Sequence, residues 1–135
     1  MVIDVHAHFL PEISLDALRR GRERFPSVEL IDDDGGPRLA FAGRPATRPI
    51  MAKLREPGPR LDFIAEQGLD SQLVGGWLDA FGYEIPAQEG AAWSRFLNQG
   101  MLEAAATIEG LRPLATVPMQ DGPLAAAVLE EAVRA

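Results

Sequence analysis

The sequence contains no cysteine, and this absence limits the kinds of site that it can form. Without thiols, neither a disulfide framework nor a thiolate metal site is possible, so any bound metal must be held by histidine and carboxylate groups. Histidine is scarce as well, with 2 residues in a chain of 135. A histidine metal site in this chain therefore has only those two residues to draw on.

Long apolar runs and an excess of basic charge are absent too. Nowhere do about 18 apolar residues follow one another, and the N-terminus carries no basic and then apolar signal segment, so we expect a soluble, cytoplasmic protein with no membrane partner. The formal net charge is -7, and the 13 lysines and arginines are scattered rather than gathered beside aromatic residues. Nucleic acid is therefore not an expected partner. With 47% hydrophobic residues, the chain has enough apolar surface for one folded core.

Apolar runs predict three strands that alternate with helices along the chain. Runs of β-branched residues are typical of buried strands, and apolar residues at the 3.6-residue period are typical of helices that cover a sheet. This order implies parallel strands joined by right-handed crossovers, which is an α/β fold. No glycine-rich phosphate loop follows a strand, which disfavours a Rossmann domain. The predicted strands are 2–6, 69–77 and 114–118, and the predicted helices are 13–24, 60–68, 86–108 and 123–135.

A long segment without this alternation follows the first strand. The turn at 32–37, rich in Asp and Gly, separates apolar runs at 28–31 and 38–41, which predicts a small hairpin. Four prolines lie between residues 42 and 59. They favour a covering loop there over a regular element.

The two histidines, His6 and His8, lie at the end of the first predicted strand. Residues two apart on a strand project from the same face, so both imidazoles can reach one ion. In a parallel barrel that face points inward, and the end of the strand lies at the C-terminal mouth, where active sites are built. Neutral imidazole is a good ligand for zinc and other divalent metals. We therefore interpret both as metal ligands; the alternative is a pair of structural histidines, because a bare His-x-His triplet is common.

One further residue of this strand bears on the site. Asp4 lies on the same strand face as the histidines, one step deeper. It is either an acceptor that orients an imidazole N–H or a barrel-floor carboxylate.

Residues 2–11, with the sequence VIDVHAHFLP, resemble the opening of the amidohydrolase superfamily. The FLP ending is similar to the branch called amidohydrolase family 2, which contains the aminocarboxymuconate-semialdehyde decarboxylases. Residues 60–70 are similar to the family's first barrel helix and second strand, and residues 114–120 to its third strand. The resemblance implies that the chain is the N-terminal portion, about three βα units, of a TIM-like metal-dependent hydrolase barrel.

In this family the first-strand histidines bind a zinc-like metal, joined by a histidine from a middle strand and an aspartate near the last strand. The resemblance thus implies metal roles for His6 and His8, with a divalent metal, zinc by preference, as the cofactor. A full barrel needs roughly 250 residues, so we expect the catalytic groups and remaining ligands beyond Ala135, and the fragment alone to be inactive. Open sheet edges predict association, and we expect a homo-oligomer in the full-length form.

By the same resemblance, the chain is one partial barrel, and residues 11–59 are an insertion that folds over the metal mouth. We name residues 11–59 the covering segment. Arg44 and Arg48 lie in its return arm, where an arginine can bind a substrate carboxylate as a fork. Trp77, where the second predicted strand ends and a loop with further aromatic residues begins, is another candidate for the substrate pocket. The alternatives are solvated arginines and an ordinary core tryptophan.

Three functions remain open at this stage. The resemblance favours a non-oxidative decarboxylase of a small unsaturated or aromatic carboxylic acid, which makes a small-molecule carboxylate the expected partner. The family's hydrolases use the same ion to activate water against an amide or lactone. A third alternative is a complete, small, non-enzymatic α/β binding domain in which the histidines are structural.

Overall fold

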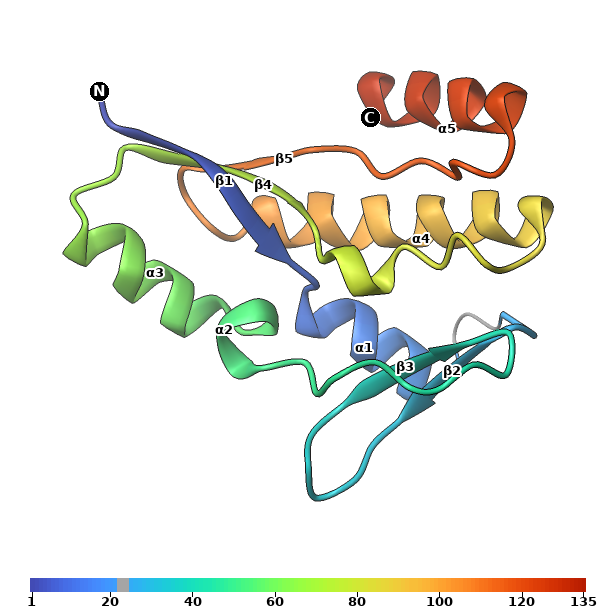
Figure 1. Ribbon diagram of the computed structural model, residues 1–135. Coiled ribbons are helices and arrows are strands. Elements are labelled where there is room, and N and C mark those ends of the chain that lie inside the picture. Colours follow the sequence, from blue (N-terminus) through green and yellow to red (C-terminus); the bar gives the residue numbers. More distant parts are fainter. Residues whose placement is uncertain (22–24) are drawn as a thin grey trace.

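The computed structural model describes residues 1–21 and 25–135, and it divides into a parallel sheet with its helices and a separate antiparallel hairpin (Figure 1). The strand order of the sheet is β1-β4-β5, and both pairings are parallel. Because helices connect the three strands, each connection crosses over to a neighbouring parallel strand, as in a βα barrel. The strands of this sheet are β1 (Ile3–Phe9), β4 (Ser71–Gly76) and β5 (Leu111–Pro113).

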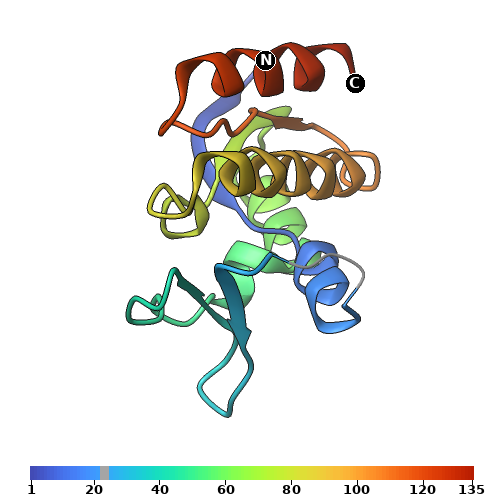
Figure 2. The same ribbon diagram turned by 90° about the vertical axis from the view of Figure 1, so that its right-hand side faces the viewer.

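The long helix α4 (Ala87–Ala105) packs on one face of the sheet, and α5 (Gly122–Arg134) lies beside α4 (Figure 2). The apolar stripe of α4 makes this contact, as its 3.6-residue period predicts. Asp121 caps α5 by accepting a hydrogen bond from the backbone N–H of Leu124. The core between α4 and the sheet contains Phe9, Val74, Met101, Ala104, Ile108 and Leu111.

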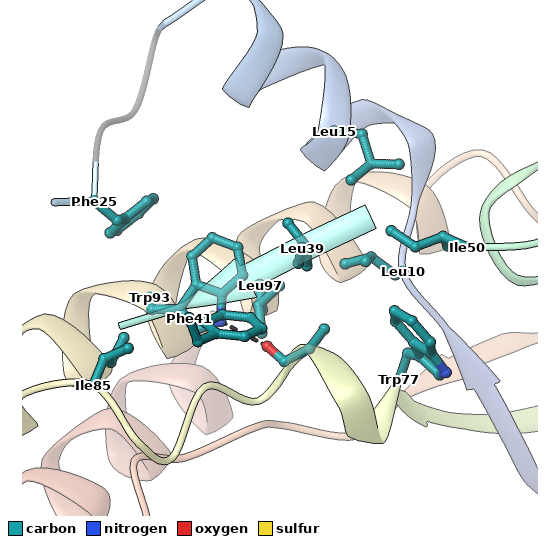
Figure 3. Close-up of a cluster of buried hydrophobic side chains, with 11 residues drawn as sticks. Leu10, Leu15, Phe25, Leu39, Phe41, Ile50, Trp77, Ile85, Trp93 and Leu97 are labelled. Atoms are coloured by element: carbon teal, nitrogen blue, oxygen red, sulfur yellow. Dashed lines mark hydrogen bonds between the residues drawn. The ribbon is translucent and has the colours of Figure 1, made fainter. Parts of the chain in front are cut away.

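The covering segment forms a second core against the other side of α4 (Figure 3). Trp93 is completely buried at its centre, with ring centroids of Phe25 and Phe41 at 5.0 and 5.9 Å. Its indole N–H donates to the carbonyl of Ala80 at 2.7 Å. The elements around this core are α1 (Glu12–Arg19), the antiparallel hairpin of β2 (Val28–Ile31) and β3 (Arg38–Phe41), and the short helix η1 (Leu78–Ala80).

Several boundaries differ from those predicted from the sequence. The first strand continues to Phe9, and the covering loop contains α2 (Ala52–Arg55) and the start of α3 (Pro57–Glu66). Pro57 suits the first turn of α3 because that position needs no N–H. The first predicted helix ends at Arg19, and its last three predicted residues, 22–24, lie outside the described residues.

The third strand was predicted at 114–118 but lies at Leu111–Pro113, so that prediction was wrong. The ladder with β4 comprises residues 111–113, and the N–H of Leu114 donates one further hydrogen bond to the carbonyl of Val74 at 2.8 Å. Beyond this, the side chain of Asn98 takes the place of a strand partner for Thr116: its Nδ2 donates to the Thr116 carbonyl at 2.9 Å, and its Oδ1 accepts from the Thr116 N–H at 2.7 Å. A side chain that satisfies the backbone in this way removes the need for a longer ladder.

Across the described ranges, we find no helix with the length and apolar character that a membrane span requires.

Candidate metal centre

The imidazoles of His6 and His8 meet at the C-terminal end of β1. Their Nε2 atoms are 3.2 Å apart, their ring centroids are 5.1 Å apart, and the rings are nearly perpendicular, at 83°. His6 is exposed and His8 is half-buried. The strand therefore places both ring nitrogens at one accessible point, as the spacing of the two residues predicts.

The neighbour of His8 determines which of its ring nitrogens carries the proton. Nδ1 of His8 lies 3.0 Å from the carbonyl oxygen of Gly76 at the end of β4. A carbonyl can only accept, so the neutral His8 ring donates from Nδ1 and keeps a lone pair on Nε2. It follows that the contact between the two rings is a hydrogen bond from Nε2–H of His6 to Nε2 of His8.

The separation of the two Nε2 atoms fits a shared metal ion. Two nitrogens bound at about 2.0–2.1 Å to one tetrahedral zinc lie about 3.3–3.4 Å apart. The observed distance is 3.2 Å, and a carbonyl that fixes the Nδ1–H tautomer is the usual second partner of a metal-binding histidine. Residues 1–21 and 25–135 contain no group of three or more His, Cys, Asp or Glu that could hold a metal, so the two histidines could fill only part of a coordination sphere.

Asp4 holds the backbone of His6 rather than its ring. Its Oδ1 accepts from the His6 N–H at 3.0 Å, and its Oδ2 accepts from Nε2 of Gln72 at 2.7 Å. These two hydrogen bonds, the first being the stronger influence, keep the pKa of Asp4 below its ordinary value. Asp4 is therefore held as a carboxylate that restrains the strand just before the two histidines.

Arg60 is a residue of this site that the sequence analysis missed. It lies in α3, yet only 7% of it is exposed, and its guanidinium stands 4.4 Å from the ring centre of Phe9. Nη2 donates to the carbonyl of His8 at 2.6 Å, and Nη1 donates to Oε1 of Gln72. Burial lowers the pKa of Arg60, while the nearby Asp4 carboxylate partly offsets this effect. In the sequence, Arg60 is one arginine near the start of a helix, and no pattern there marks it.

The predicted substrate-binding residues lie outside this network. Arg48 is exposed, donates from Nε to Oδ2 of Asp79 at 3.0 Å, and stands 5.6 Å from the ring centre of Trp77. Trp77 is only 2% exposed and packs in the core of the covering segment. Arg44 is exposed, and among the described residues it has no side-chain hydrogen bond or ion pair. The structure thus brings Arg48 and Trp77 together and leaves Arg44 apart.

Comparison with known proteins finds similarity in structure alone. No family model matches the sequence, and no curated protein matches it. Among solved structures, the chain is similar to the apo crystal structure of IDCase from Metarhizium anisopliae, with a TM-score of 0.66 and 16% sequence identity. The match covers 97% of this chain and 39% of the IDCase chain. The predicted fold class is confirmed: the chain has a mixed α/β fold with a parallel sheet that matches part of a TIM-like barrel.

Proposed function

We propose that this chain supplies the first-strand half of the metal centre of a metal-dependent decarboxylase that acts on a small unsaturated or aromatic carboxylic acid. The observation that carries the proposal is the 3.2 Å separation of the two Nε2 atoms at the C-terminal end of β1. The likeness to IDCase, an isoorotate decarboxylase, supports the choice of reaction. Because the chain spans 39% of that protein, the activity of a whole barrel is part of the proposal.

The histidines would act through their Nε2 atoms. His8 already presents its Nε2 lone pair, because Nδ1 donates to Gly76. His6 has to release its Nε2 proton, by moving to the Nδ1–H tautomer, before it can bind the same ion. A bound divalent metal, zinc in our proposal, supplies Lewis acidity and a template for the substrate carboxylate.

Arg48 would bind the substrate carboxylate as a planar fork. Its present partner, Asp79, is partly exposed, and an exposed ion pair of this kind is weak enough for another carboxylate to replace. Trp77 would support the Arg48 guanidinium from below, through the contact at 5.6 Å. In this proposal Arg44 remains a second candidate to bind the substrate carboxylate, although no contact of its side chain supports that role.

Calorimetric titration with zinc tests the metal site. We expect one zinc ion per chain, bound weakly because the chain contributes two ligands, and no such binding in the His6→Ala/His8→Ala variant. The matched control is Asp33→Asn/Asp34→Asn, which removes charge from the acidic turn and should bind zinc as the unchanged chain does. If the histidine variant retains binding, or the control loses it, the metal centre is not at the histidines.

A reaction assay tests the chemistry separately. Because we expect the fragment alone to be inactive, the whole barrel is loaded with zinc and incubated with isoorotate and with small aromatic carboxylic acids. Carbon dioxide release is measured together with hydrolysis of amides and lactones. Release of carbon dioxide that depends on His6 and His8 supports the decarboxylase. Histidine-dependent hydrolysis without carbon dioxide release would replace it with the hydrolase.

A further inference from the structure

We propose that Arg60 is a positioning residue that holds both halves of the histidine pair in the arrangement that one metal ion requires. The inference rests on the proposed function, because it assigns a role in the same site. The hydrogen bonds that support this role run from Arg60 in α3 to β1, which carries His6 and His8. They pass through side chains that the metal would not touch.

The backbone around His6 needs such support because the sheet does not provide it. The register of β1 against β4 is irregular between Asp4 and Ala7, and regular pairing resumes at Ala7 with Val74. His6 lies inside this irregularity. A strand residue in a bulge lacks the ladder contacts that normally fix its position. Something other than backbone pairing must therefore set where the His6 imidazole points.

Side chains supply the missing support on the His6 side. The N–H of His6 donates to Oδ1 of Asp4 at 3.0 Å, and Oδ2 of Asp4 accepts from Gln72 at 2.7 Å. Oε1 of the same Gln72 amide accepts from Nη1 of Arg60. Arg60 thus fixes the orientation of the Gln72 amide, because the amide must present its oxygen to the guanidinium and its NH₂ to the carboxylate.

A direct contact serves the His8 side. Nη2 of Arg60 donates to the carbonyl oxygen of His8 at 2.6 Å. The His8 ring then reaches across to the carbonyl of Gly76 at 3.0 Å, which selects the tautomer with a free Nε2. One guanidinium therefore contacts the His8 backbone directly and the His6 backbone through two side chains.

The burial of Arg60 argues for a positioning role over simple packing. Only 7% of the Arg60 residue is exposed, burial of a guanidinium is costly, and its Nε has no hydrogen-bond partner among the described residues. A buried ionic group seldom adds stability over an apolar side chain of similar size. The planar fork does offer two donors at fixed spacing for two acceptors at once, which neither an apolar side chain nor lysine can do.

Nitrogen NMR of the histidine side chains provides the test, because it reads the tautomer of each ring and does not require metal. We compare the unchanged protein with Arg60→Met, Arg60→Lys and Gln72→Met, at a pH of about 8.5, two units above the ordinary histidine pKa. The matched control is Arg55→Met. Arg55 likewise donates two side-chain hydrogen bonds, to the Glu12 carboxylate and to the Ile50 carbonyl, and neither acceptor belongs to β1. Zinc titration of the same proteins gives the affinity.

We expect His8 in the unchanged protein to be the Nδ1–H tautomer, and both rings of Arg60→Met to show averaged tautomers. Zinc affinity of Arg60→Met should fall by about 10- to 100-fold, as for losses of outer-sphere partners in metal sites. The zinc affinity of Arg60→Lys should lie between those of the unchanged protein and of Arg60→Met, since one donor can still reach the His8 carbonyl. Gln72→Met should disturb His6 and leave His8 unchanged, and Arg55→Met should leave both rings unchanged.

The positioning role is wrong if folded Arg60→Met keeps both the original tautomers and the original zinc affinity, or if Arg55→Met causes equal losses. If Arg60→Met does not fold, Gln72→Met and Arg60→Lys decide by the same criteria. If the unchanged protein binds no zinc, and Arg60→Met still loses the His8 tautomer, the proposed function is contradicted and the positioning role is supported. The two proposals therefore fail independently.

Discussion

Two arginines, Arg60 and Arg48, show how differently the strand end and the covering segment hold their polar groups. Arg60 is 7% exposed and donates to two acceptors. One is the carbonyl of His8 in β1, and the other is the amide oxygen of Gln72, which itself donates to Asp4 of β1. Arg48 is exposed, and its contacts are one carboxylate, Asp79, and the face of Trp77. The strand end is therefore fixed before any ligand arrives. The covering segment offers a cation whose partner can be exchanged.

This difference matches what each region would have to do in the proposed site. Metal ligands must be held in place by their surroundings, because a small displacement weakens coordination. A group that captures a substrate carboxylate needs to release its resting partner, which an exposed ion pair permits at little cost. Variants that act on one region and spare the other test whether the two regions differ in this way.

The largest effect should come from removing the side chain that joins the covering segment to α4. Trp93→Ala leaves a cavity among Phe25, Phe41 and the Ala80 carbonyl, and we expect it to lower the free energy of unfolding by about 3–5 kcal/mol. Denaturant unfolding measures the loss. Phe63→Ala, at a side chain that is 45% exposed, is the control and should cost about 1 kcal/mol or less. Equal losses in the two variants would show that Trp93 does not anchor the segment.

A smaller effect should follow from crowding the strand end itself. In Gly76→Ala the new Cβ would lie 2.8 Å from the Phe81 ring and 2.9 Å from Oγ1 of Thr116, so we expect a loss of about 1–3 kcal/mol. Because the Gly76 carbonyl accepts from His8, zinc affinity should fall as well. Gly58→Ala, which has nothing within 4 Å of its Cβ, should leave both quantities nearly unchanged. Unfolding and zinc titrations of the pair decide, and a neutral Gly76→Ala would refute the close packing described.

The exposed ion pair between Arg48 of the covering segment and Asp79 should contribute less to the free energy of unfolding. A double-mutant cycle with Arg48→Met and Asp79→Asn should give a coupling below about 1 kcal/mol, because both groups are exposed and screened by solvent. The coupling should shrink further as salt is added. A coupling above about 2 kcal/mol, insensitive to salt, would mean that Arg48 is as firmly held as Arg60, and the proposed exchange of partners would then fail.

The smallest effect concerns pH. Two hydrogen bonds from Arg19 hold the pKa of Asp32 below its ordinary value. A lowered pKa in the folded state means that the stabilisation is present above the unfolded pKa of about 3.9 and is lost as the pH falls through the folded value. Since both groups are partly exposed, we expect about 0.5 kcal/mol. The difference in unfolding free energy between the unchanged chain and Asp32→Asn, followed from pH 6 downward, should shrink over that window; a constant difference would contradict the assignment.

The sequence predicts the order of elements well because periodicity depends on local burial. The hairpin at 28–31 and 38–41 and the long helix before Ile108 are present in the structure close to their predicted bounds. The third strand is displaced because its length depends on the partner that β4 offers and on Asn98, which lies on another element. Pairing between distant segments cannot be inferred from the local pattern of either one.

The candidate site shows the same limit. His6 and His8 were predicted as a pair because strand geometry alone brings residues two apart to one face. Arg60 and Gln72 could not be found in this way, since they reach the strand from residues 52 and 64 positions further along the chain than His8. Buried polar networks of this kind depend on tertiary packing, and no periodicity marks them.

X-ray absorption of the zinc-loaded protein shows whether His6 and His8 share one ion, because it reports the atoms that surround the ion. We expect two imidazole nitrogens at about 2.0–2.1 Å, with water or other oxygen ligands in the remaining positions, and loss of the imidazole signal in His6→Ala/His8→Ala. A zinc ion surrounded by oxygen alone, or a single imidazole, would contradict it, because His6 and His8 would then not share one metal.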